Sequence, residues 1–156
     1  MPLIALAAST DDLRARAATV LSRVTWPGKR GEKAVAPLTA AEQQRFDAGR
    51  EVYQNICQAC HQADGRGQEK LAPTLIGSPL ALADPGIPAR ILLNGKEGPI
   101  GLMPPIGSAL NDDQIAAVLT YIRREWSNDG SPVDAALIKK MRALTAARTR
   151  PWTTDE

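Results

Sequence analysis

The sequence predicts an all-α protein, on three observations. Apolar residues recur three or four positions apart in several segments, as they do along one face of a helix. Two of these segments begin with a capping box, in which a Thr or Asn precedes a Glu or Gln by three residues. Runs of β-branched residues are few, and strand patterns do not alternate with helix patterns. The 156 residues suit one domain with appendages at its ends.

The first helix is expected near the N-terminus, where Thr10 can cap it and Trp26-Pro27-Gly28 stops it. Its apolar face comprises Leu13, Ala17, Val20, Leu21 and Val24. Residues 29–37, charged at their start, are expected to be a linker. Residues 1–28 are then either the final helix of an upstream module or a helix that packs on the following domain.

A second helix is expected after Thr39, which can form a capping box with Glu42. It leads directly to Cys57, and one side of it carries Phe46, Gly49, Val52, Tyr53 and Ile56. Gly49 either lets another helix cross closely or is an ordinary mid-helix glycine, which costs about 0.5–1 kcal/mol relative to alanine.

Residues Cys57-Gln58-Ala59-Cys60-His61 spell C-x-x-C-H and include both cysteines and the only histidine of the chain. Each thiol can add to a haem vinyl group, and the adjacent imidazole can coordinate the iron. The motif therefore predicts one haem c, attached through Cys57 and Cys60, with His61 as an iron ligand. A thioredoxin-like dithiol would need a βαβ setting that the flanking sequence lacks. A closed zinc site usually takes four Cys or His ligands, and this chain offers only three. A chance match would have used every Cys and His of the chain by accident.

Two more helices are expected towards the C-terminus. Asn111 and Gln114 form a capping box, and Leu110 with Ile115 can form a hydrophobic staple. The stripe of that helix comprises Ile115, Val118, Leu119, Ile122 and Trp126, with Tyr121 beside it and Asp129-Gly130 ending the segment. The last helix is expected from Ser131-Pro132, with Val133, Leu137, Met141 and Leu144 on one face.

Gly49 and Tyr53 ahead of the C-x-x-C-H motif, with an aromatic-bearing helix around Tyr121, resemble the class I cytochrome c family. The resemblance covers about residues 38–128. It implies the cytochrome c fold, in which the N- and C-terminal helices cross at near right angles beside one haem, here with an extra helix at each end. The expected parts are a helical appendage (1–28), a linker (29–37), a haem domain (38–128) and a C-terminal helix and tail (129–156).

The sixth iron ligand is sought among Met1, Met103, Met141 and the lysines, because the one histidine is already used. Met1 lies on the appended end, and Met141 lies on an apolar stripe, where packing is its expected role. Met103 lies in a loop of glycines and prolines that can direct a thioether at a flat cofactor. The family supplies its axial methionine from such a loop, and Met103 matches it. The alternative is an ordinary loop methionine.

The resemblance implies three further contacts with the haem or its ligands. The carbonyl of Pro73 would accept the proton-bearing nitrogen of His61. Leu75 would pack on the porphyrin. Arg90 is similar to a position that often faces a haem propionate, and its alternative is a solvated arginine on a helix face. Gly67 is expected to serve a turn rather than the chemistry.

Composition agrees with a haem protein, because six aromatic residues are few for a core of this size and a porphyrin would add apolar area. The net charge of +2 and the dispersed basic residues do not indicate nucleic-acid binding. No stretch approaches the roughly 20 apolar residues of a membrane span. The N-terminus makes a poor signal peptide. A c-type haem nevertheless implies a periplasmic or other non-cytoplasmic location. The export signal is then expected either to lie upstream in a longer parent protein or to have been replaced by another sequence.

The expected function is single-haem electron transfer, one electron at a time, from a dehydrogenase to another cytochrome or an oxidase. The C-terminal end resembles cytochrome domains fused to bacterial quinoprotein or β-propeller dehydrogenases. Trp152 in this end either anchors the tail or contacts a partner. The alternative function is a haem enzyme or gas-binding sensor with an open distal site, which the lack of a second histidine disfavours. A haem-free dithiol protein is the third candidate.

Overall fold

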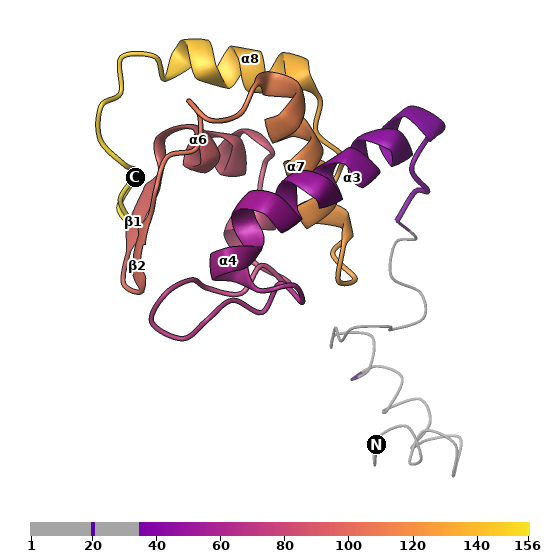
Figure 1. The fold of residues 1–156 in the computed structure, drawn as a ribbon, viewed down its shortest axis with the longest axis horizontal. Helices are drawn as coiled ribbons and strands as arrows, with labels where there is room; N and C mark the ends of the chain where they lie inside the picture. The colour runs from indigo at the N-terminus through magenta and orange to yellow at the C-terminus, as the bar shows by residue number, and fades with distance from the viewer. Residues whose placement is uncertain (1–19, 21–34) are drawn as a thin grey trace. The chain divides into compact units, whose positions relative to one another are not determined.

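The computed structural model describes residue 20 and residues 35–156 (Figure 1). The chain divides into two units, Met1–Val35 and Ala36–Glu156, and the second is described here. The predicted helix of residues 1–28 and the first part of the predicted linker lie outside the described residues.

The described unit is mainly helical, which confirms the predicted fold class. Its α-helices are α3 (Ala40–Val52), α4 (Gln58–His61), α5 (Pro79–Leu82), α6 (Gly86–Asn94), α7 (Asp112–Arg124) and α8 (Ala135–Leu144). A π-helical turn, η1 (Tyr53–Cys57), joins α3 to α4. The sequence did not predict the antiparallel hairpin of β1 (Lys96–Gly98) and β2 (Gly101–Met103), which replaces the start of the expected loop.

Both predicted capping boxes are present. Thr39 and Glu42 bond each other's backbone at the start of α3, and Asn111 and Gln114 do so at the start of α7. Each box satisfies two amide groups that would otherwise lack a partner in the first turn. These contacts are local in sequence, which is why the helix starts could be predicted.

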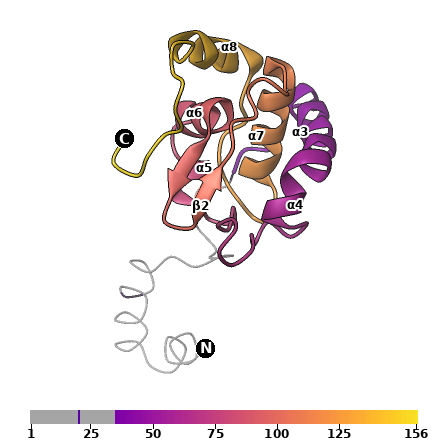
Figure 2. The same cartoon turned by 60° about the vertical axis from the view of Figure 1, so that its left-hand side comes forward.

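Helices α3 and α7 cross and pack closely on each other, as Figures 1 and 2 show. At the crossing, a Cβ atom added to Gly49 would lie 2.0 Å from the Ala117 carbonyl oxygen and 2.9 Å from the Tyr121 Cβ. Only a residue without a side chain fits there. Gly49 is therefore the crossing glycine, and its interpretation as an ordinary mid-helix glycine is wrong.

Two apolar clusters lie on either side of α7. The first joins α6, α7 and α8, and it comprises Ala89, Leu92, Leu93, Leu110, Ile115, Ala116, Leu119, Val133 and Ile138. The second joins α3, η1 and α7, and it comprises Phe46, Tyr53, Cys57, Ala81, Val118, Tyr121 and Ile122. Helix α7 is thus covered on both sides, which explains why every residue from Ile115 to Arg123 is buried.

The predicted end of α7 is wrong. The helix stops at Arg124, and Trp126 and Ser127 follow it in left-handed backbone conformations, with φ of 53° and 64°. Trp126 therefore lies in a turn rather than on the helical stripe. Its ring packs edge-on against Tyr53 and Tyr121, with centroids 5.2 and 5.5 Å away. These contacts hold the side chain where the helix would not have placed it.

The predicted start of the last helix is also wrong. Helix α8 begins at Ala135, because the side chain of Asp134 caps it by accepting from the Leu137 amide at 2.8 Å. Val133 is buried ahead of the helix, and Ile138 rather than Leu144 completes the buried face. Leu144 is 68% exposed.

Candidate haem site

The π-helical turn sets the position of the first cysteine. The amide of Gln58 donates to the carbonyl of Tyr53, five residues back, so the turn holds one residue more than an α-helical turn. Cys57 is buried and Cys60 is half-buried, and both are free thiols. Burial, with a smaller effect of Cys60, raises the pKa of the Cys57 thiol to about 11. Burial therefore disfavours the thiolate form of Cys57.

His61 ends α4 and is 9% exposed. Its Nδ1 lies 3.1 Å from the carbonyl oxygen of Pro73, the contact that the sequence analysis expected. A carbonyl can only accept, so Nδ1 carries the proton and Nε2 keeps a lone pair for a metal. Burial lowers the pKa of His61, and the bond to Pro73 opposes this only in part. The imidazole is therefore neutral at pH 7, as a metal ligand must be.

Gly65 and Gly67 shape the loop between His61 and Pro73. Both have left-handed backbone conformations, with φ of 70° and 75°. A Cβ atom on Gly67 would lie 2.6 Å from the Pro73 carbonyl oxygen, and one on Gly65 would lie 2.7 Å from the Trp126 ring. Gly67 thus serves the turn, as predicted, and it also lets the Pro73 carbonyl approach His61.

Asn128 holds the segment just after Pro73, a role that no sequence pattern predicts. Its Nδ2 donates to the carbonyls of Leu75 (3.1 Å) and Ile122 (2.7 Å), and its Oδ1 accepts from the amide of Gly77 (2.8 Å). The side chain is buried, so it ties the loop to the end of α7 without competition from water. No spacing rule marks this role, because a polar residue after a helix is usually a surface cap.

Arg123 is a second buried polar residue that the sequence analysis missed. It is 2% exposed, and its guanidinium donates to the carbonyls of Ala81 (2.7 Å), Ala83 (2.8 Å) and Ser131 (2.8 Å). These carbonyls belong to the end of α5 and to the segment before α8. Arg123 therefore joins α7 to the end of α5 and to the segment before α8, and its role is structural.

Met103 is the last residue of β2, where it pairs with Lys96 of β1. Its side chain is half-buried and packs on the cluster of α6, α7 and α8. Met141 packs on the same cluster from α8, and its Sδ lies 3.3 Å from the position that a Cβ of Gly86 would take. Met1 lies outside the described residues.

Leu75 and Arg90, the other two residues predicted to contact the haem, pack against different parts of the fold. Leu75 is half-buried and packs on the cluster of Tyr53 and Cys57. Arg90 lies on α6, where its Nε donates to the Gly86 carbonyl at 3.1 Å and its guanidinium lies 5.5 Å from the Trp152 ring centroid. The contacts of Leu75 with a porphyrin and of Arg90 with a propionate stay predictions.

These residues fit a covalently bound haem. A hollow of about 490 Å³ lies between the loop after His61 and the tip of the β1–β2 hairpin, lined by Arg66, Gln68, Glu69, Lys70, Ala72, Pro73, Thr74, Pro99 and Ile100. Cys57, Cys60 and His61 directly precede the loop that forms one wall of this hollow. Neither they nor Met103 are among its lining residues. Among the described residues, no three His, Cys, Asp or Glu side chains are grouped to hold a metal ion by themselves. No helix in that part of the chain is long and apolar enough to cross a membrane.

Comparison with known proteins agrees with this site. Residues 44–122 match the model of the family described as "Cytochrome C oxidase, cbb3-type, subunit III". The cytochrome c subunit of the quinone-dependent alcohol dehydrogenase from Gluconobacter oxydans (strain 621H) is 32% identical over 164 residues, 92% of this chain and 33% of the relative. The cytochrome c subunit of gluconate 2-dehydrogenase from Pantoea cypripedii is 32% identical over 111 residues, 63% of this chain and 25% of the relative.

A shorter relative matches less than half of this chain. Cytochrome c-554(548) from Halomonas halodenitrificans (strain ATCC 12084 / NCIMB 8669) is 34% identical over 65 residues, which are 42% of this chain and 78% of that protein. By contrast, this chain spans about a third of the length of the Gluconobacter subunit.

Proposed function

Because this chain belongs to the cytochrome c family described as cbb3-type cytochrome c oxidase subunit III, we propose that it carries one electron at a time with an iron ligated by His61 and Met103. It is an electron-carrier domain with one haem c on Cys57 and Cys60, related to the cytochrome subunits of dehydrogenases. When bound, the haem supplies an iron that gains and loses one electron, and methionine ligation raises its potential.

The observation that carries the proposal is the contact between His61 and Pro73. The 3.1 Å separation of Nδ1 from the carbonyl oxygen fixes both the tautomer and the plane of the ring. Asn128 and Gly67 hold the loop that bears this carbonyl, so the ring has a rigid support. A ligand held in one orientation suits electron transfer, because little rearranges when the charge of the iron changes.

Met103 is the second ligand in this proposal. The β1–β2 hairpin that carries it contributes Pro99 and Ile100 to the hollow opposite Pro73. Met141, the other methionine of the described residues, packs between α6 and α8. A thioether is uncharged at every pH, so Met103 can stay half-buried beside apolar residues at no cost of ionisation.

The names of the relatives support a proposal for the partners, and the type of haem supports one for the location. Several of them are named as cytochrome subunits of dehydrogenases for alcohols, gluconate or fructose. We therefore propose a dehydrogenase as the electron donor and a cytochrome or oxidase as the acceptor. Because c-type haem is normally attached outside the cytoplasm, we propose a periplasmic or similar location. The division into residues 1–28, 29–37, 38–128 and 129–156 remains part of the same proposal.

Carbon monoxide tests the ligation. The reduced wild-type protein should bind carbon monoxide slowly and incompletely, because Met103 occupies the sixth position. Met103→Ala should bind it rapidly and completely, while the control Met141→Leu should behave as the wild type does. Rapid and complete binding by the wild type would overturn the proposal in favour of an enzyme or sensor with an open distal site. Unchanged slow binding by Met103→Ala would show that another residue is the ligand.

A further inference from the structure

The C-terminal tail, residues 148–156, lies along the edge of the hairpin that carries Met103. The amide of Trp152 donates to the Gly95 carbonyl at 3.0 Å, and the amide of Glu97 donates to the Trp152 carbonyl at 2.7 Å. Lys96 thus bridges to Trp152 on one side and pairs with Met103 on the other. Trp152 thus forms an isolated parallel bridge at the outer edge of β1, and Met103 lies on β2 at the opposite edge of the hairpin.

The side chain of Trp152 fixes the tail to α6. Its Nε1 donates to the carbonyl of Arg90 at 3.1 Å. The guanidinium of Arg148 lies 3.6 Å from the ring centroid, and that of Arg90 lies 5.5 Å away. Both distances are within the range of cation–π attraction. The ring therefore joins the tail to the helix that immediately precedes β1.

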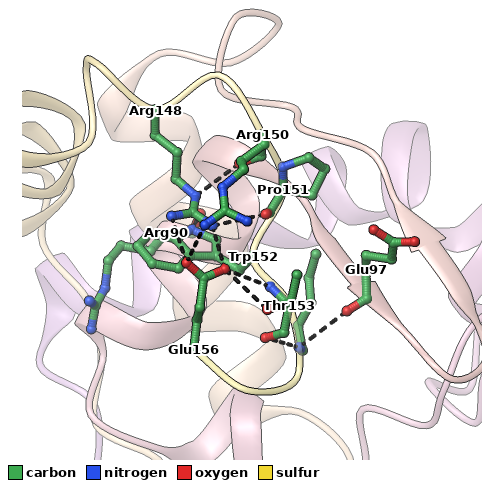
Figure 3. A network of polar contacts seen from close by, with 9 residues as sticks. Arg90, Glu97, Arg148, Arg150, Pro151, Trp152, Thr153 and Glu156 are labelled. Atoms are coloured by element: carbon green, nitrogen blue, oxygen red, sulfur yellow. Dashed lines mark hydrogen bonds and ion pairs between the residues drawn. The ribbon is translucent and has the colours of Figure 1, made fainter.

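The tail is closed into a loop by Glu156, as Figure 3 shows. The carboxylate accepts from Arg148 at 2.7 Å and from Arg150 at 3.1 Å, and its Oε2 also lies 3.2 Å from the amide of Thr153. The bond to Arg148, the largest cause, holds the pKa of Glu156 at about 2, so the carboxylate is charged at neutral pH. In addition, Lys96 Nζ donates to the Thr153 carbonyl at 3.0 Å.

We propose that the tail is a positioning element for Met103, with Trp152 as its anchor and the Arg148–Glu156 pair as its closure. A two-stranded hairpin is marginally stable by itself, and a segment that bonds to its edge and is fixed to a helix reduces its fluctuations. Met103 has no covalent tie to the haem, so its residence on the iron depends on how firmly the hairpin is held. The inference rests on the proposed function, in which Met103 is the sixth ligand.

The test measures the rate at which carbon monoxide binds the reduced, full-length haem protein, since this rate reports how often Met103 leaves the iron. Trp152→Ala removes a hydrogen bond and two cation–π contacts, so we expect the rate to rise by about tenfold or more. Trp152→Phe keeps the ring but loses the donor, and we expect a smaller rise. Glu156→Gln should also raise the rate, whereas the control Asp155→Asn removes the same charge from an exposed neighbour and should leave it unchanged.

The reduction potential provides a second readout. Weaker methionine ligation should lower the potential of Trp152→Ala relative to the wild type. If Trp152→Ala does not fold, the rates of Trp152→Phe and Glu156→Gln decide the question. Wild-type rates in both of these variants, together with a fast rate in Met103→Ala, would overturn the role of the tail and leave the ligation intact. A slow rate in Met103→Ala would instead overturn the proposed function.

Discussion

The two sides of the proposed haem site are held in different ways. On the His61 side, the loop is fixed by buried contacts with α7, made by Asn128 and Trp126. On the Met103 side, the hairpin is held by α6 and by the tail, whose closing ion pairs are at the surface. Buried hydrogen bonds are stronger and less open to water than surface ion pairs. We therefore expect the methionine side to open while the histidine side stays closed.

The largest expected effect is at the helix crossing that supports the His61 side. Gly49→Ala would force a Cβ to within 2.0 Å of the Ala117 carbonyl oxygen and separate α3 from α7. We expect a loss of about 3 kcal/mol or more in the free energy of unfolding, measured with denaturant. Gly98→Ala is the matched control, because an added Cβ on that hairpin glycine meets nothing within 4 Å. Equal losses in the two variants would contradict this packing.

Asn128→Ala should have the next largest effect. It removes three hydrogen bonds, so the buried carbonyl of Ile122 and the partly buried carbonyl of Leu75 and amide of Gly77 lose this partner. We expect a loss of about 2–3 kcal/mol in the free energy of unfolding. Asn55→Ala, a change at an exposed position, is the control and should alter stability by no more than about 0.5 kcal/mol. A similarly small change for Asn128→Ala would contradict the claim that Asn128 holds this side of the site.

A pair of smaller changes compares the two sides directly. Tyr53→Phe and Trp152→Phe each keep an aromatic ring and remove one donor to a backbone carbonyl, that of Gln62 at 2.6 Å or that of Arg90 at 3.1 Å. Tyr53→Phe should lower the free energy of unfolding by about 1 kcal/mol and leave carbon monoxide binding unchanged. Trp152→Phe should leave the free energy of unfolding unchanged and raise the rate of carbon monoxide binding. If both variants alter the same observable, the two sides are not held independently.

The smallest expected effect is a pH dependence of the tail. The folded protein depresses the pKa of Glu156 to about 2 from its ordinary value of 4.5. Its contribution to closing the tail is therefore fully present above about pH 4.5 and is lost as the pH falls towards 2. Hydrogen-exchange protection of the Glu97 amide should be lower at pH 3 than at pH 5. The difference should vanish in Glu156→Gln, and a difference that persists there would assign the effect to another group.

The parts of the fold that depend on neighbours in sequence could be predicted. The capping boxes at Thr39 and Asn111 need only residues three positions apart. The position of Gly49 before the motif, which resembles a known family, makes a helix crossing one of its two interpretations from sequence. In both cases the signal lies in a short stretch of sequence.

The parts that depend on distant contacts could not be predicted. Asn128 meets Leu75 and Gly77 about fifty positions away, and Trp126 leaves its helix to pack on Tyr53. The π-helical turn, Tyr53–Cys57, contains neither Gly nor Pro that would interrupt the helical pattern. The bridge between Trp152 and Lys96 depends on the hairpin, which the sequence does not predict. The sequence could therefore nominate Met103 as a ligand, but it could not show what holds Met103 in place.

The central claim is that the core holds the His61 side and the tail holds the Met103 side. The most direct test is the rate of carbon monoxide binding to reduced Trp152→Ala and Asn128→Ala, measured side by side under conditions where both are folded. We predict a rate at least about tenfold above the wild type for Trp152→Ala and a rate close to the wild type for Asn128→Ala. A faster rate for Asn128→Ala than for Trp152→Ala would contradict the claim.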